Sequence, residues 1–259
     1  MSIKLTILGT GTFFVNKNRS ASAYLLEIKG KKILIDCGPG TLMRLSQLGI
    51  KLEDIDYVFI THFHADHTSD LFPFFMNFRL NDFFIKNKNT KYPKIIGPVG
   101  IKKFIINLSK DFQLPALQKW NKVEFINIKP SQKIENIKVE AYKVKHIAFG
   151  LRANAYAYRF SIDNKIISFS GDSVRCPGVE RACRNSDVFV CDASYPKGMG
   201  NLAHMDTQDI AEIASKQDVK KIILSHFYPQ YDSVNLIKEI REKFSGEIVK
   251  GKDSMIILI

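Results

Sequence analysis

The chain has 259 residues, of which 45% are hydrophobic and 25% are charged, and these proportions are typical of a soluble globular protein with a substantial core. No run approaches the roughly 18 consecutive apolar residues of a membrane-spanning helix, which excludes that class of protein. The formal net charge of +12 favours contact with a polyanion such as RNA or DNA, or with an acidic substrate, although the scattered lysine pairs also fit a general lysine bias.

The four cysteines form no CxxC pair and no regular framework, so we interpret them as reduced thiols of a cytosolic protein. Cys37 and Cys191 each follow an apolar run, which predicts core packing. The N-terminus enters a strand pattern directly and contains no apolar stretch long enough for an export signal. The sequence therefore predicts a cytoplasmic protein that is not associated with a membrane.

Apolar periodicity predicts strands and helices in alternation along the first half of the chain. We expect strands at residues 3–8, 22–28, 32–36, 56–60, 95–99 and 122–128, and helices at 41–49 and 101–108. The glycine-containing segment 9–12 is not followed by a helix pattern, so we expect it to approach the functional site and not to bind a dinucleotide. Residues 87–92 are polar and are predicted to form a loop.

Residues 61–67, Thr-His-Phe-His-Ala-Asp-His, directly follow a predicted buried strand and are rich in potential metal ligands. If strand geometry persists, His62 and His64 point to the same side, while Asp66 and His67 begin a helix. Imidazoles and carboxylates bind zinc and similar divalent metals. His62 and His64 can therefore hold one ion while Asp66 and His67 face a second. Four such residues within six positions argue against a merely polar surface turn.

The second half repeats the pattern of a strand that ends in a ligand-type residue. We expect strands at 137–144, 155–162, 165–169, 188–191 and 220–224, helices at 207–215 and 233–244, and closing strand material at 247–259. His146, Asp172 and His226 each follow one of these strands. The chain is therefore predicted to be one domain, residues 1–259, built from two similar halves at about 1–130 and 131–259.

The sequence His62-Phe-His-Ala-Asp-His67 resembles the His-x-His-x-Asp-His signature of the metallo-β-lactamase superfamily, and the resemblance covers most of the chain. It implies an α/β fold of the αββα four-layer sandwich type, with the metal site along one edge. It also implies two metal ions. The first would be bound by His62, His64 and His146, the second by Asp66, His67 and His226, and both would be bridged by Asp172.

The resemblance also implies roles beyond metal binding. Asp36, at a strand end that matches the superfamily pattern, would orient the metal-binding loops, and the alternative is a simple helix-start residue. Asp66 would orient the metal-bridging hydroxide that attacks the substrate and accept its proton. Residues 203–214 resemble the His-helix motif of ribonuclease Z, in which the residue matching His204 donates a proton to the leaving oxygen. The alternative for His204 is a surface residue at a helix start.

Two departures from ribonuclease Z concern its tRNA substrate. Typical ribonuclease Z enzymes insert a long tRNA-clamping arm between the residues that match His146 and Asp172, where this chain has only 25 residues. After His226 the chain reads Phe-Tyr-Pro-Gln-Tyr, where the tRNA-processing enzymes tend to have Ser-x-Arg-Tyr. The resemblance therefore implies the catalytic residues without the tRNA-binding arm.

Together these features predict a ribonuclease Z-like phosphodiesterase that acts on RNA ends or on a small phosphodiester such as a cyclic nucleotide. A hydrolase of carboxyl esters, thiol esters or lactones is the alternative enzyme, and a non-catalytic nucleic-acid-binding metalloprotein is a third hypothesis. The two divalent ions are expected to be zinc from the number of histidines, with manganese or iron also compatible. The aromatic segment 71–84 suits a core, a substrate wall or a subunit interface. Ribonuclease Z relatives pair through this region, which implies a homodimer.

Overall fold

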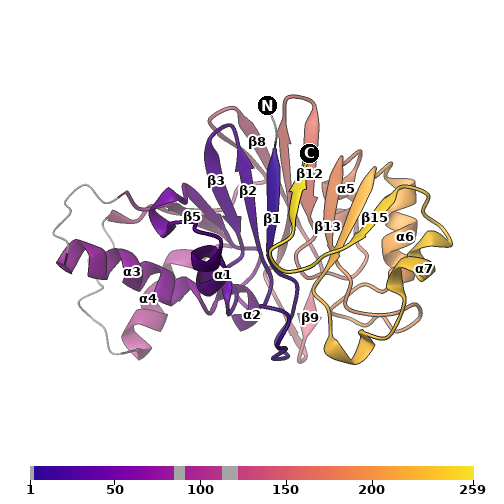
Figure 1. Cartoon of the computed structure of the whole chain (residues 1–259), viewed down its shortest axis with the longest axis horizontal. Coiled ribbons are helices and arrows are strands. Elements are labelled where there is room, and N and C mark those ends of the chain that lie inside the picture. The colour runs from indigo at the N-terminus through magenta and orange to yellow at the C-terminus, as the bar shows by residue number, and fades with distance from the viewer. Residues whose placement is uncertain (1–2, 85–90, 113–121) are drawn as a thin grey trace.

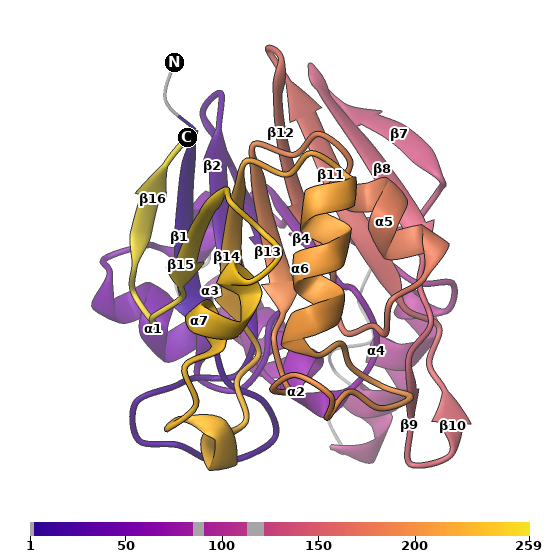
Figure 2. The same ribbon diagram turned by 90° about the vertical axis from the view of Figure 1, so that its right-hand side faces the viewer.

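The computed structural model describes residues 3–84, 91–112 and 122–259. Two seven-stranded sheets face each other, with α1, α3 and α4 outside one sheet and α5, α6 and α7 outside the other (Figures 1 and 2). This arrangement confirms the predicted αββα sandwich. Among the described residues, no helix has the length and apolar character needed to cross a bilayer.

The first half of the chain builds most of the first sheet, which has the strand order β16-β1-β2-β3-β4-β5-β6. Its strands are β1 (Lys4–Gly9), β2 (Ala23–Ile28), β3 (Lys31–Ile35), β4 (Tyr57–Phe59), β5 (Lys94–Gly97), β6 (Phe125–Asn127) and β16 (Ile256–Leu258). The helices of this half are α1 (Thr41–Gln47), α2 (Ala65–Thr68), α3 (Leu71–Phe84) and α4 (Ile101–Asp111), with a 3₁₀ turn at Leu52–Asp54.

The second sheet has the order β15-β14-β13-β12-β11-β8-β7. Its strands are β7 (Ser131–Ile134), β8 (Ile137–Lys143), β11 (Tyr156–Ile162), β12 (Lys165–Phe169), β13 (Val188–Asp192), β14 (Lys221–Ser225) and β15 (Glu247–Lys250). A short separate hairpin is formed by β9 (Ile147–Ala148) and β10 (Leu151–Arg152). The helices are α5 (Pro177–Cys183), α6 (Thr207–Lys216) and α7 (Leu236–Arg241), and a 3₁₀ turn spans Pro229–Tyr231.

Three apolar clusters hold these layers together. The central cluster lies between the sheets, where Phe59 of the first sheet meets Tyr158 and Phe160 of the second at ring-centroid distances of 5.3 and 5.2 Å. The other two lie between each sheet and its outer helices. Cys37 and Cys191 are buried in these outer clusters, as predicted. Burial of apolar side chains on both faces of each sheet fixes the distance between the layers.

The direction of the strands determines where the functional residues meet. In the first sheet β3, β4, β5 and β6 run parallel, and in the second β12, β13, β14 and β15 run parallel. The carboxyl ends of parallel strands lie at one edge of a sheet, and loops at such an edge commonly form binding sites. His62, His64, Asp172 and His226 follow the ends of such strands, and His146 follows the end of β8.

Several details differ from the sequence-based expectation. The closing segment 247–259 forms β15 in the second sheet and β16, which crosses back to pair with β1 of the first. Strand β7, helix α5 and the β9–β10 hairpin were not predicted. Of the expected loop 87–92, only residues 91–92 lie within the described residues, and they form neither helix nor strand.

The aromatic segment 71–84 forms α3, and its aromatic residues divide between core and surface. Four side chains are buried in the outer cluster of the first half, namely Phe72, Phe74, Phe75 and Phe78. Phe84 is 72% exposed and Leu80 is 45% exposed near the end of the helix. Among the side chains that the structure describes, most of the stripe is therefore core, and apolar surface lies at its C-terminal end.

Candidate metal centre

Six segments place polar side chains close together at one edge of the sandwich. The loop after β4 carries His62 and His64 and continues into α2, which carries Asp66 and His67. From the second half, the loops after β8, β12 and β14 supply one residue each, namely His146, Asp172 and His226. The segment before α6 adds His204. All eight of the sequence-predicted metal-binding and proton-donor residues therefore lie in one region.

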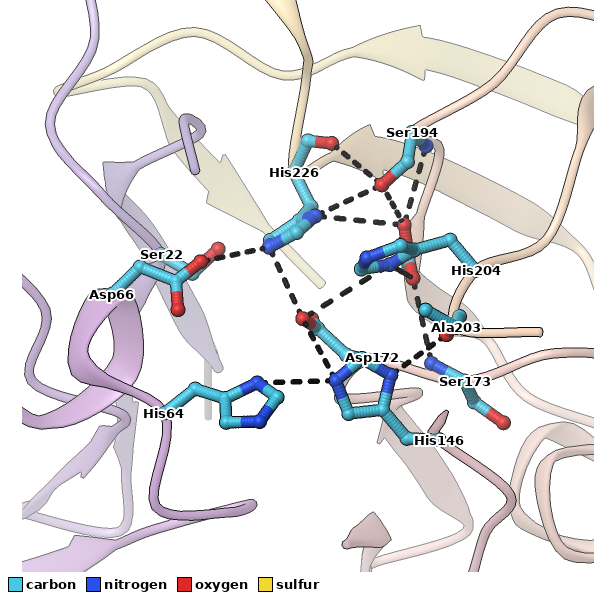
Figure 3. Close-up of polar contacts among 12 residues, drawn as sticks. Ser22, His64, Asp66, His146, Asp172, Ser173, Ser194, Ala203, His204 and His226 are labelled. Atoms are coloured by element: carbon cyan, nitrogen blue, oxygen red, sulfur yellow. Dashed lines mark hydrogen bonds and ion pairs between the residues drawn. The ribbon is translucent and has the colours of Figure 1, made fainter. Parts of the chain in front are cut away.

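The candidate ligand atoms form three overlapping groups that share the Asp172 carboxylate, and Figure 3 shows His64, Asp66, His146, Asp172 and His226 facing one another. The first group consists of His62, His64, His146 and Asp172, the second of Asp66, His67, Asp172 and His226, and the third of Asp172, Asp192, His204 and His226. Within each group these atoms lie within 4.8 Å of one another. Asp172 Oδ1 lies 3.2 Å from His67 Nε2 of the second group, and its Oδ2 lies 3.8 Å from His62 Nε2 and 3.9 Å from His146 Nε2 of the first. The Asp172 carboxylate therefore faces both groups, as a bridging ligand would.

Asp36 organises the histidines of the first half through a buried hydrogen-bond relay. Its carboxylate accepts from the Thr61 amide at 2.7 Å, from the Thr61 hydroxyl at 2.9 Å and from His67 Nδ1 at 2.7 Å. Because the Thr61 hydroxyl donates to Asp36, its oxygen accepts from His62 Nδ1 at 3.0 Å. Both imidazoles therefore direct Nδ1 into this relay and turn Nε2 toward the site.

The second half contains a corresponding relay around Asp192. The Asp192 carboxylate accepts from His204 Nδ1 at 2.7 Å and from the Ser194 hydroxyl. The Ser194 oxygen in turn accepts from His226 Nδ1 at 2.9 Å (Figure 3). His226 therefore turns Nε2 toward the other candidate ligands. His204 turns its Nε2 toward the pocket that these residues line.

His146 is oriented by backbone instead of a carboxylate. Its Nδ1 donates to the Ala203 carbonyl at 2.8 Å, so Nε2 is the nitrogen turned toward the other candidate ligands. That Nε2 lies 3.1 Å from Nδ1 of His64, which is half-buried. Two imidazole nitrogens this close are stabilised by a shared proton or by a cation between them.

Unsatisfied buried atoms test whether this site fits divalent cations. His62 Nε2, His67 Nε2 and Asp66 Oδ1 are buried and have no hydrogen-bond partner within the described residues. Buried polar atoms are almost always satisfied, so each such atom needs an explanation. All three point into the groups described above, and imidazole nitrogen with carboxylate oxygen is a donor set suited to zinc. The residues therefore fit a divalent metal site.

The charges within the site couple the pKa values of its members. Burial lowers the pKa of His62 well below its usual range, and the neighbouring His67 lowers it further. Burial would also lower the pKa of His67, but Asp172, Asp66 and Asp36 raise it well above the ordinary value. Conversely, burial favours a raised pKa for Asp172, but His226 and His67 hold that pKa well below its usual range. Asp172 is therefore ionised and ready to bind a cation.

His204 differs from the other histidines of the site. Burial would lower its pKa, but the carboxylates of Asp192, Asp172 and Asp66 outweigh this effect and raise the pKa to about 9. An imidazole with this environment holds a proton at neutral pH. That property suits a general acid.

Backbone geometry explains why the segment after β3 has its particular sequence. Asp36 adopts the left-handed region with a φ of 58°, as does His226 with a φ of 60°, and such conformations in non-glycine residues concentrate at functional sites. At Gly38 a Cβ atom would lie 1.9 Å from the Asp66 carbonyl oxygen. Only glycine permits this approach, which brings the segment after β3 against α2.

A pocket of about 360 Å³ opens over the metal-ligand groups. His64, Asp66, His146, Asp172, His204 and His226 line its floor. Its apolar walls include Phe13, Phe149, Tyr195, Leu202 and Tyr228. The volume is in the range of small-molecule sites.

Sequence reasoning missed several of these residues. Thr61 and Ser194 act through hydrogen bonds that depend on the packing of neighbouring strands, and no local pattern marks them. Asp192 did carry a signal, because it ends a buried strand just as Asp36 does. Phe13 and Tyr228 come from loops whose position over the pocket is set only by the assembled fold.

Comparisons with known proteins agree with this geometry. Residues 3–250 match the family model described as anti-Pycsar protein Apyc1. The chain is 28% identical to ribonuclease Z of Clostridium tetani, with 99% of this chain and 98% of that protein covered, and 23% identical to ribonuclease Z of Methanosarcina mazei, with 98% and 97% covered. The Clostridium tetani alignment runs over 323 residues, so that protein contains extra segments that this 259-residue chain lacks.

Solved structures establish the fold. The metallo-β-lactamase fold protein YhfI from Bacillus subtilis superposes with a TM-score of 0.84 at 22% identity, covering 100% of both chains. The short form of human tRNase Z superposes with a TM-score of 0.75 at 23% identity, covering 98% of both chains. The predicted metallo-β-lactamase fold and the resemblance to ribonuclease Z are thereby confirmed.

Proposed function

Because this chain belongs to the anti-Pycsar protein Apyc1 family and is a metal-dependent hydrolase of the metallo-β-lactamase fold, we propose that it cleaves phosphodiesters at a centre of two divalent cations. One observation carries the proposal. Two groups of four candidate ligands share Asp172, and three of their buried polar atoms, His62 Nε2, His67 Nε2 and Asp66 Oδ1, have no hydrogen-bond partner within the described residues.

In this proposal the metal ligands are assigned by group. The first cation is held by His62, His64 and His146, the second by Asp66, His67 and His226, and Asp172 bridges them. Five histidines favour zinc over manganese or iron, although all three ions accept these ligands. When bound, such a pair of cations supplies a water of lowered pKa and neutralises charge that develops on phosphoryl oxygens.

The remaining residues divide the work of positioning and proton transfer. Asp66 has one carboxylate oxygen without a hydrogen-bond partner, so it can orient the attacking water and accept its proton. His204 holds a proton at Nε2 over the same pocket and donates it to the leaving oxygen. Asp36 holds Nδ1 of His67 directly and Nδ1 of His62 through Thr61, which turns the Nε2 atoms of both rings toward the metal.

The size of the pocket and the length of the chain bear on the substrate. The sequence predicts two possible classes of substrate, RNA ends and a small phosphodiester such as a cyclic nucleotide. The ribonuclease Z relatives are named for RNA, but they contain segments that this chain lacks. Between His146 and Asp172 the chain forms only the β9–β10 hairpin and two strands of the sheet. A pocket of about 360 Å³ with aromatic walls favours the small phosphodiester.

We also keep the proposal of a homodimer formed from one-domain subunits with two related halves. The exposed Leu80 and Phe84 at the end of α3 provide apolar surface for such a contact. Light scattering of the purified protein tests it, because a homodimer has twice the mass of the 29.5 kDa chain. A monomer at micromolar concentration would contradict it.

The test of function is hydrolysis by metal-loaded protein of bis(p-nitrophenyl) phosphate, cyclic nucleotides and RNA with a 3′ extension. We expect turnover of the first two, and loss of turnover after chelation or in Asp66→Ala. Asp54→Ala is a matched control, because Asp54 is a surface carboxylate that pairs with Lys32 away from the site. Turnover of lactones or thioesters without any phosphodiester cleavage would favour the alternative ester hydrolase and overturn the proposal.

A further inference from the structure

Tyr228 occupies a position beside the proton donor that no role described so far explains. It is half-buried and lines the same pocket as His204. Its hydroxyl oxygen lies 3.4 Å from Nε2 of His204, and its ring meets that of His204 edge-on at 5.8 Å. The one polar atom of this side chain therefore faces the nitrogen that would act on the leaving group.

The hydrogen bonds of His204 leave only one of its nitrogens for the substrate. Nδ1 is committed to the Asp192 carboxylate at 2.7 Å, and a carboxylate can only accept in that bond. The separation of 3.4 Å between Nε2 and the Tyr228 hydroxyl exceeds the range of about 2.7–3.2 Å of a well-formed hydrogen bond. Both donors point into the pocket, so a single substrate oxygen can lie within hydrogen-bond distance of both.

The surroundings of Tyr228 fix its ring in place. Tyr195 stacks on it at 5.5 Å with an interplanar angle of 24°, and Phe14 packs edge-on at 5.5 Å. The next residue, Pro229, restricts Tyr228 to the extended backbone that it adopts, with a φ of −83° and a ψ of 129°. A hydroxyl held this rigidly loses little entropy when it binds a substrate oxygen.

We propose that the Tyr228 hydroxyl is a second hydrogen-bond donor to the leaving oxygen, alongside His204. This inference rests on the proposed phosphodiesterase function. As the bond from phosphorus to the leaving oxygen breaks, its electron pair stays on that oxygen, which takes the Nε2 proton of His204. The water oxygen forms the new bond to phosphorus and gives a proton to Asp66. His204 ends neutral, and Tyr228 keeps its proton throughout, because burial raises the pKa of its phenol above the ordinary value.

The role predicts which substrates depend on Tyr228. A leaving group that carries a concentrated negative charge needs both donors, whereas p-nitrophenolate disperses its charge and needs them least. A lost hydrogen bond to a charged group corresponds to a rate loss of roughly 10- to 100-fold. Tyr228→Phe should therefore be nearly silent on an activated ester and strongly impaired on an unactivated one.

The experiment uses a series of methyl aryl phosphates whose leaving phenols run from p-nitrophenol to phenol, with the metal-loaded full chain. In Tyr228→Phe we expect kcat to fall increasingly along the series, to about 10- to 100-fold below wild type at phenol, with little change in KM. Tyr231→Phe is the matched control, because Tyr231 packs on Tyr195 but does not line the pocket. It should follow wild type throughout.

Each other outcome has a definite meaning. An equal loss on every ester, or a loss matched by lower metal content, would assign Tyr228 a structural role and overturn the inference. No loss on any ester would overturn it as well. If wild type cleaves none of the series although metal is bound, the proposed function itself fails, and the inference fails with it.

Discussion

Replacement of Asp36 by asparagine tests whether the buried relay of the first half prepares the histidines for metal. The carboxylate accepts three hydrogen bonds, two from Thr61 and one from His67, and it is 1% exposed. An asparagine has one acceptor oxygen, and its amide group would face N–H and O–H donors. His67 would then move its proton from Nδ1 to Nε2, the atom that faces the metal.

The expected magnitude follows from these contacts. If the oxygen of the substituted asparagine keeps the Thr61 amide, two hydrogen bonds to a charged group are lost, each worth about 1.5–3 kcal/mol. Part of this loss is offset because burial opposes the charged form of Asp36 and raises its pKa. We expect the metal-free protein to lose about 2–4 kcal/mol of its free energy of unfolding. The affinity for zinc should fall about 10- to 100-fold.

Zinc competition with a chromophoric chelator measures the affinity, and urea unfolding in excess chelator measures the stability. Asp70→Asn is the control, because Asp70 Oδ2 accepts the amides of Gly40 and Leu42 and an asparagine oxygen can replace it. This variant should bind zinc as wild type does. Wild-type zinc affinity in Asp36→Asn, or an equal loss in both variants, would refute the relay.

Three further predictions concern other parts of the molecule. Asp192→Asn keeps an acceptor oxygen for His204 Nδ1 but removes the negative charge that raises the pKa of His204, so kcat on a phenyl phosphodiester should fall about 10²- to 10⁴-fold, and an unchanged rate would count against His204 as the proton donor. Zinc added to metal-free protein at about 1,000 times its Kd should raise the free energy of unfolding by about 4 kcal/mol per site. An unchanged urea midpoint would count against a preformed site. Burial opposes ionisation of Asp187, but hydrogen bonds from Lys220 and the Ile166 amide outweigh it and lower its pKa. Its ionised form therefore stabilises the fold above the ordinary carboxyl pKa, so Asp187→Asn should cost about 1–2 kcal/mol in urea unfolding at pH 7 and progressively less as the pH falls below about 4.

The sequence predicted the floor of the site because that information is local. His62, His64, Asp66 and His67 lie within six positions after a buried strand, and the structure brings them together at the strand's end. His146 and Asp172 were recognisable in the same way, since each follows a strand. The αββα sandwich was predicted from the resemblance of this motif to the metallo-β-lactamase signature and from the alternation of strands and helices.

Features that depend on tertiary packing could not be predicted. Ser194 reaches His226 only because β13 and β14 are neighbours in the sheet. Strand β16 pairs with β1, although the two strands lie at opposite ends of the sequence. Because β16 has only three residues, its hydrophobic pattern is too short to predict this pairing. Helix α5 begins with Pro177 and Gly178, which in isolation favour a turn.

The count of bound metal ions tests the central claim most directly. Metal-free protein is reloaded with zinc, freed of excess ion, and analysed for zinc by elemental analysis against protein concentration. The account predicts two zinc ions per chain, and a loss of stoichiometric binding in Asp172→Ala because both ligand groups share this carboxylate. One ion or none in the wild type, or two ions retained in Asp172→Ala, would contradict it.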